Sequence, residues 1–189
     1  MLQQNIWQTK AIPAFLIIGL LLSLSCQTGS NRVIIQELGF SMSLPKGWLT
    51  DSREPSTFYE KSKRDDNWGM VVEYQLEEGE TMEEFVENTL KESEEMETMY
   101  KKMAKTLGRI VGEEELGEEI SETRIVAKTP CKVSNLNAIE VVKEAEYTVL
   151  EVYIDKGDKV IEVFFRALPE DFPKYEPSFR QAIESIKIQ

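Results

Sequence analysis

The chain of 189 residues contains no histidine and only two cysteines, Cys26 and Cys131. The absence of histidine excludes histidine-assisted serine or cysteine nucleophiles, and it excludes zinc or iron sites that depend on imidazole ligands. Cys131 follows a proline in the segment TPCKV, where nothing in the sequence indicates the lowered pKa that a reactive thiol needs. We therefore interpret Cys131 as a small buried or half-buried residue.

Basic residues are also scarce, with 22 Lys and Arg against 34 Asp and Glu, for a net charge of −12. No basic cluster offsets this excess, so we exclude nucleic acid as a partner. The negative charge is regional, because residues 77–122 hold 16 acidic and 5 basic residues, a net of −11.

Long hydrophobic runs are absent except at the N-terminus. Residues 11–24, AIPAFLIIGLLLSL, form an apolar stretch of 14 residues, whereas a membrane-spanning helix needs about 20. Lys10 is the one charged residue among the first 25, and a polar tract, QTGSNR, begins at residue 27. These features are typical of an export signal. We predict a signal peptide over residues 1–25, with a retained anchor helix as the alternative.

The hydrophobic run ends in LSLSC, which resembles the lipobox of bacterial lipoproteins. In that family the cysteine thiol receives a diacylglyceryl group and the signal peptide is cut before it. Ser23 and Leu24 depart from the usual lipobox residues, and Ser23 and Ser25 also permit ordinary cleavage before Cys26. We predict that Cys26 is the lipid attachment site and that residues 26–32 form a short spacer. A spare thiol is the alternative for Cys26.

Residues 33–189 are long enough for one domain with its own core, and no repeat or linker divides them. Alternating apolar residues predict a strand and turn in GFSMSLPKGW, in which we expect Trp48 to close the edge of the core; an exposed recognition role for Trp48 is the alternative. Hairpins are expected around KRDDN (63–67) and DKGD (155–158). Shorter strands are expected within residues 109–116, 120–128 and 138–146, for about six strands in total.

Two helices are expected. Thr81 and Glu84 have the spacing of a capping box, and the apolar residues that follow recur at steps of three and four, which predicts a helix over about 81–107. Pro177 suits the start of a C-terminal helix over about 177–187. The methionines of the long helix lie mainly on its apolar face, where we expect core packing, with a binding surface as the alternative. Strands and helices in this order predict an α+β domain with an antiparallel sheet and helical cover.

Together, GFSMSLPKGW, the long helix and the closing segment FPKYEPSFRQAIESIKI resemble the PsbP/Mog-like superfamily over about residues 33–188. The export signal and Cys26 match its branch of bacterial envelope lipoproteins, the DcrB-like proteins. The resemblance implies an α/β/α sandwich around a central antiparallel sheet, and a binding or accessory role rather than catalysis. The superfamily hosts several unrelated roles, so no activity follows from its fold alone.

The acidic residues mostly occur in runs, such as 112–119 (GEEELGEE), which we interpret as a solvated surface. A divalent-cation site for Ca²⁺ or Mn²⁺ in this segment is one alternative function, although the spacing of a preorganised calcium loop is missing. A hydrolase with a site assembled from scattered residues is the second alternative. We assign no catalytic, cofactor-binding or metal-binding residue.

The sequence thus predicts a lipid-anchored protein of the bacterial cell envelope that acts as an accessory or binding module. Its expected partners are the membrane, through the lipid on Cys26, and a protein of the envelope. Gln27 after the cysteine resembles an outer-membrane sorting signal, which favours the outer membrane, with the domain facing the periplasm or the cell surface.

Overall fold

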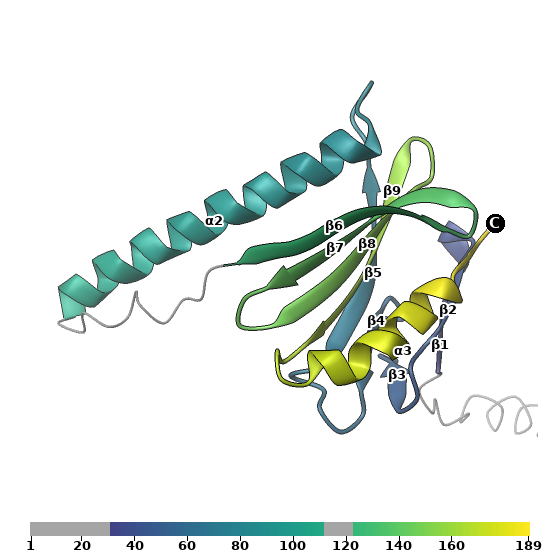
Figure 1. Cartoon of the computed structure of the whole chain (residues 1–189), viewed down its shortest axis with the longest axis horizontal. Helices are drawn as coiled ribbons and strands as arrows, with labels where there is room; N and C mark the ends of the chain where they lie inside the picture. Colours follow the sequence, from purple (N-terminus) through teal and green to yellow (C-terminus); the bar gives the residue numbers. More distant parts are fainter. Residues whose placement is uncertain (1–30, 112–122) are drawn as a thin grey trace, which may run out of the picture.

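The computed structural model of the chain describes residues 31–111 and 123–189. Within these residues, seven strands form an antiparallel sheet in the order β3-β4-β5-β9-β8-β7-β6, and three strands form a smaller sheet in the order β1-β2-β10. The predicted α+β class with an antiparallel sheet is confirmed, and the large sheet has one strand more than expected (Figure 1).

The elements follow one another in a simple order. In the first half of the domain they are β1 (Arg32–Ile35), the 3-10 turn η1 (Gln36–Leu38), β2 (Phe40–Ser43), β3 (Trp48–Thr50), β4 (Thr57–Glu60), β5 (Trp68–Gln75) and α2 (Met82–Val111). In the second half they are β6 (Arg124–Val133), β7 (Leu136–Glu144), β8 (Thr148–Asp155), β9 (Lys159–Ala167), α3 (Phe172–Glu184) and β10 (Lys187–Ile188).

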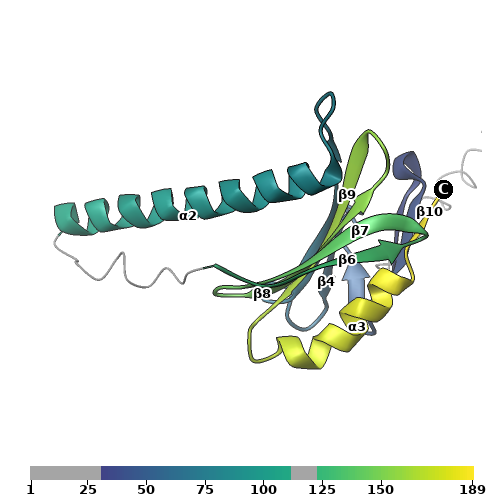
Figure 2. The same cartoon turned by 45° about the horizontal axis from the view of Figure 1, so that its top comes forward.

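The two helices pack on opposite faces of the large sheet. Alternate residues of β8 show this, because Leu150, Val152 and Ile154 belong to the core beneath α3, while Tyr153 belongs to a second core beneath α2. The small sheet joins α3 on its side, through buried residues such as Val33 and Met42. The resulting layers, with the large sheet between the helices, can be followed in Figure 2.

Trp48 lies in the larger core, at 1% exposure. Its ring packs against those of Phe58, Phe165 and Phe179, with centroids 5.3–6.1 Å apart. The expectation that Trp48 closes the core is therefore confirmed, and the alternative of an exposed recognition residue is wrong. The turn before Trp48 places Gly47 at φ +89°, a conformation that residues with a Cβ rarely adopt.

Three helix boundaries differ from the sequence prediction. The C-terminal helix begins at Phe172 and not near residue 177, because Asp171 is its N-cap residue, Pro173 lies in its first turn and Pro177 lies inside it. The helix ends at Glu184. Residues 187–188 pair with β2 as a strand. The long helix begins with the predicted capping box, in which Glu84 N donates to Thr81 Oγ1 and Thr81 N donates to Glu84 Oε2. It continues through Gly108 to Val111, so the strand expected from residue 109 is helix over 109–111.

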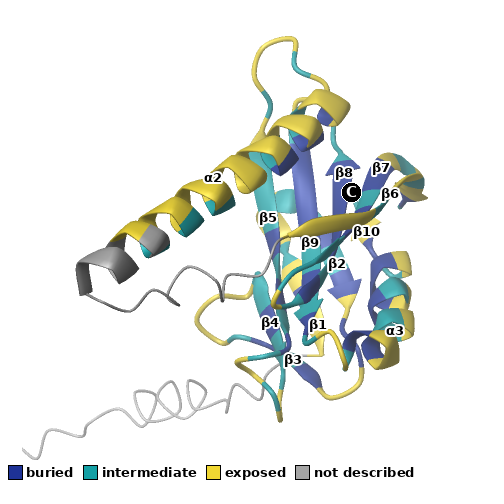
Figure 3. Cartoon of the chain, turned by 60° about the vertical axis from the view of Figure 1, so that its left-hand side comes forward, coloured by how far each residue is buried: buried dark blue, intermediate teal, exposed yellow. Residues whose placement is uncertain are grey.

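Helix α2 covers the sheet only near its beginning. Met82, Val86 and Leu90 are buried against the sheet, whereas Met96, Met99 and Met103 are each 51% exposed. Of the four methionines of this helix named above, only Met82 packs in the core. Core packing is the wrong expectation for the other three, because the helix extends beyond the edge of the sheet that could cover them. Figure 3 shows the same pattern, with buried residues near the start of α2 and exposed residues along its far half.

Candidate binding surface

The face of the large sheet that packs on α2 is only partly covered by this helix. Along β9 the residues of this face are Val160, Glu162, Phe164 and Arg166, and they pass from buried beneath the helix to half-buried beyond it. On β5 the matching residues run from Tyr74 back to Trp68, which lies opposite Arg166 in the register. The part of this face beyond the helix, which we call the open face, carries the polar and aromatic groups described below.

Two buried glutamates lie where the cover of α2 ends. Glu151 and Glu162 are each 7% exposed, and they come from the neighbouring strands β8 and β9. Lys143 Nζ lies 2.7 Å from Glu151 Oε1, and the Tyr153 hydroxyl donates a 2.8 Å hydrogen bond to Glu151 Oε2. The Tyr74 hydroxyl donates a 2.8 Å hydrogen bond to Glu162 Oε2. One lysine thus faces two carboxylates.

Burial and the neighbouring charge of Glu151 raise the pKa of Glu162 above its usual value, although the hydrogen bond from Tyr74 and the charge of Lys143 act in the opposite direction. Burial and the same carboxylates also raise the pKa values of Tyr74 and Tyr153, so both hydroxyls stay protonated and act as donors. The cluster is therefore a set of buried acids whose charge is only partly compensated.

A hollow of about 430 Å³ lies at the end of the open face where β5 begins. It is lined by Glu54, Thr57, Tyr59, Arg64, Asp65, Trp68, Met70 and Arg166. The Arg166 guanidinium carbon lies 4.7 Å from the Trp68 ring centroid and 4.0 Å from that of Tyr147. The Trp68 ring also contacts Phe164 edge-on at 5.2 Å. Arg166 is thus held between two aromatic rings.

A second arginine lies at the rim of the hollow. Arg64 places its guanidinium carbon 4.4 Å from the Tyr59 ring centroid and forms an ion pair with Asp51. The backbone N–H of Arg53 donates to Asp51 Oδ1 at 2.8 Å and lowers the pKa of Asp51, and the charge of Arg64 lowers it further. Arg166 Nη2 donates to the Asp65 carbonyl at 2.7 Å, which ties the loop between β4 and β5 to β9.

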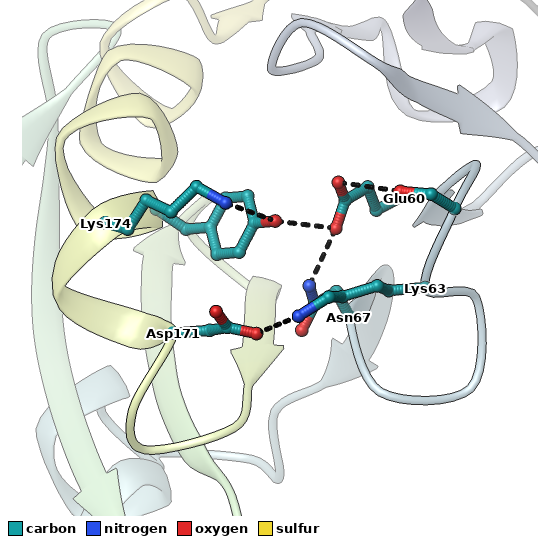
Figure 4. Close-up of polar contacts among 7 residues, drawn as sticks. Glu60, Lys63, Asn67, Asp171 and Lys174 are labelled. Carbon is teal, nitrogen blue, oxygen red and sulfur yellow. Dashed lines mark hydrogen bonds and ion pairs between the residues drawn. The ribbon is translucent and has the colours of Figure 1, made fainter.

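A polar network beneath this loop fixes its position (Figure 4). Glu60 accepts hydrogen bonds from Asn67 Nδ2 at 2.7 Å and from the Tyr175 hydroxyl at 2.8 Å, while Lys63 forms an ion pair with Asp171 at the start of α3. Burial acts to raise the pKa of Glu60, but the hydrogen bonds outweigh it and hold this pKa below its usual value. The network holds the loop that carries Arg64 and Asp65 against α3.

The residues to which the sequence assigned chemistry lie elsewhere. Cys26 and the acidic run 112–119 are outside the described residues, so the lipid site and the cation alternative stay predictions. Cys131 is a free thiol of intermediate exposure, and burial together with the charge of Glu140 raises its pKa, which disfavours the reactive thiolate. In the described ranges, no group of three or more acids or cysteines could hold a metal ion.

Sequence reasoning missed both the glutamate pair and the hollow. A signal for the pair was present, because VLEVY and VIEVF each contain a single glutamate within an otherwise apolar strand. Such a residue on a strand that is covered on both faces must be buried and partnered. The stack of Arg166 carried no comparable signal, because Trp68 and Arg166 are almost 100 residues apart and meet only through the pairing of β5 with β9.

No protein-family model matches the chain, and no curated protein matches it in sequence. The solution structure of cyanobacterial PsbP (CyanoP) from Synechocystis sp. PCC 6803 superposes with a TM-score of 0.53 at 12% identity, covering 86% of this chain and 95% of that one. The crystal structure of LpqN, involved in cell envelope biogenesis of Mycobacterium tuberculosis, superposes with a TM-score of 0.50 at 10% identity, covering 87% of each chain. At these identities the likeness concerns the fold, which is PsbP-like, as the resemblance of the sequence predicts.

Proposed function

We propose that this protein is a lipid-anchored accessory protein of a bacterial cell envelope, and that it holds a protein partner on its open face. The observation that carries the binding role is the half-buried stack of Trp68, Arg166 and Tyr147 beside the hollow. Trp, Tyr and Arg are the residue types most enriched at the centres of protein interfaces, where they supply most of the binding free energy. Trp68 and Arg166 line the hollow together with Met70 and a second tyrosine, Tyr59.

The assignment to the envelope draws on two features. The N-terminal segment has the pattern of a lipoprotein signal that ends at Cys26, and the fold is shared with LpqN, a protein described as involved in cell envelope biogenesis. Among the described residues, no helix is long and apolar enough to span a membrane. In this proposal, membrane attachment comes from acyl chains at Cys26, of which two suffice for a stable anchor.

The spacer limits how far the domain can move from the membrane. β1 begins at Arg32, six residues after Cys26, and six extended residues span at most about 20 Å. The far end of α2 points away from β1 in both Figure 1 and Figure 2. A domain tethered through β1 would therefore extend the helix away from the lipid surface.

We expect no catalytic activity. Hydrolysis by paired carboxylates needs two acids that reach the substrate. Glu151 and Glu162, of which Glu162 has a raised pKa, are each 7% exposed and do not line the hollow, and this burial supports a structural role for the pair. The acids that do line the hollow, Glu54 and Asp65, lie there among the cations Arg64 and Arg166.

A crosslinked pull-down of the full-length chain from its own envelope tests the binding role. We expect Trp68→Ala to lose the partner that the wild-type chain captures, because the substitution removes one wall of the stack. Ile34→Ala is the control, since Ile34 is an exposed large hydrophobic residue on β1, outside the open face. Equal capture by wild type and by Trp68→Ala would contradict the proposal.

A further inference from the structure

The far half of α2 carries an exposed apolar stripe. Within the described residues, four of the seven large hydrophobic side chains that are exposed lie between positions 96 and 103 of this helix. They are Met96, Met99, Tyr100 and Met103, each 51–54% exposed. Together they form a patch on the order of a few hundred Å², and contiguous exposed apolar patches of this size mark interaction sites.

The stripe continues the side of the helix that is buried at its beginning. Steps of three and four residues place Met96, Tyr100 and Met103 in line with Met82 and Phe85, which pack on the large sheet. The far half of this helix runs past the edge of the sheet, as Figures 1 and 2 show. The same helix therefore presents a core-like side beyond the part of the sheet that it covers.

The charges beside the stripe change sign near its centre. Glu92 and Glu95 precede Met96 and Lys102 precedes Met103, whereas Glu97 and Lys101 between them form a 2.9 Å ion pair within the same chain. Two such helices placed parallel would bring acids against acids and lysines against lysines. Two placed antiparallel would bring the acidic part of each against the basic part of the other, which is favourable.

We propose that this stripe binds a second copy of the chain, with the two α2 helices antiparallel and crossing near Met99. In this arrangement Met96 of one copy lies against Met103 of the other, and Glu95 lies against Lys102. In sequence, the midpoint of residues 96 and 103 and the midpoint of residues 95 and 102 each lie within one residue of Met99. Glu95 and Lys102 are seven residues apart, or two helical turns, so both lie on the same side of the helix.

The ion pair that Glu95 makes within its own chain does not compete strongly. Lys91 Nζ lies 3.8 Å from Glu95 Oε1, and both side chains are largely exposed, so this contact contributes little. A membrane is a poor occupant of the stripe, because Glu92 and Glu95 beside it are repelled by anionic lipid head groups. In the antiparallel arrangement the charge pattern of one copy is complementary to that of a second, identical copy. This complementarity favours self-association over another occupant.

The area of the stripe is smaller than the area that each partner buries in a standard stable interface, which is about 800 Å². We therefore expect a weak dimer whose population depends on protein concentration. In a twofold-symmetric dimer the stripes of both copies are buried against each other. No stripe is left to bind a third copy, so association stops at the dimer.

Cysteine crosslinking of the full-length chain in mild detergent tests the pairing. Met99→Cys places a thiol near the proposed twofold axis, and we expect a disulfide-linked dimer on mild oxidation. Glu83→Cys, on the first turn of the same helix, is the matched control and is expected to give no more dimer than the unsubstituted chain, which reports any contribution of Cys26 and Cys131. Equal yields for both variants would overturn the proposal.

Charge reversal then tests whether the occupant is a second copy. In the Met99→Cys background, Glu95→Lys and Lys102→Glu are each expected to lower the dimer yield several-fold, and the double reversal is expected to restore it. The double reversal can restore pairing only if the opposite helix carries the same two substitutions, which means that it belongs to a second copy of the chain. Loss in both single variants without restoration would overturn pairing with a second copy, and no loss in either would overturn the antiparallel arrangement. All these side chains are exposed, so melting temperatures should stay unchanged.

Discussion

The Tyr74 hydroxyl donates a 2.8 Å hydrogen bond to the buried carboxylate of Glu162, which shares its surroundings with a second buried acid, Glu151. The two glutamates face a single ammonium group, that of Lys143. Because burial and Glu151 raise the pKa of Glu162, the folded protein binds a proton at this carboxylate more tightly than the unfolded chain does. The stability that this proton provides is fully present below the unfolded pKa near 4.5 and is lost as the pH rises through the folded value.

Glu162→Gln should therefore stabilise the protein at pH 8, because the amide cannot ionise and still accepts the hydrogen bond from Tyr74. We expect about 1 kcal/mol, which corresponds to a rise of about 2–4 °C in melting temperature for a domain of this size. The gain should shrink as the pH falls toward 4.5. Thermal melts of both proteins between pH 4.5 and 8 measure this, and a Gln variant that is less stable at pH 8 would contradict the assignment.

Glu60→Gln should have the opposite effect. Hydrogen bonds from Asn67, Tyr175 and Ser62 hold the pKa of Glu60 below its usual value, so its charge contributes stability above pH 4.5 that is lost as the pH falls. We expect the variant to lose about 1 kcal/mol at pH 7, since charge-assisted hydrogen bonds are replaced by neutral ones. Chemical denaturation at pH 7 and pH 4 measures the difference, and a penalty that grows toward acid would refute this reasoning.

Trp48 provides a test of the core. Trp48→Ala should cost about 3–5 kcal/mol, because it empties a site surrounded by three phenylalanine rings. Trp48→Phe should cost no more than about 1.5 kcal/mol, because the indole Nε1 is buried and has no hydrogen-bond partner within the described residues. Urea unfolding of both variants decides this. Equal losses in the two variants would contradict this account of the core.

The sequence predicts those parts of the fold that local patterns encode. The hairpin of β8 and β9 follows from strict alternation around DKGD, where Gly157 adopts φ +86°. The start of α2 follows from the capping box of Thr81 and Glu84. The start of α3 lies five residues before the predicted one, because Pro173, and not Pro177, occupies the first turn.

The candidate binding surface is less predictable, because it arises from tertiary contacts. Trp68 and Arg166 meet through strand pairing, and only the geometry of β5 and β9 brings them together. The exposure of Met96 and Met103 could not be predicted either, because the helical pattern gives the apolar side of α2 but not the width of the sheet beneath it.

In the function we propose, this domain works at a membrane surface to which Cys26 holds it. Metabolic labelling of the full-length chain with an alkyne fatty acid, in a bacterial host, tests this most directly. We predict label in the wild type and in Cys131→Ala, and none in Cys26→Ala, which should leave the membrane fraction. Equal label in the wild type and Cys26→Ala, or an unlabelled wild type, would contradict the account.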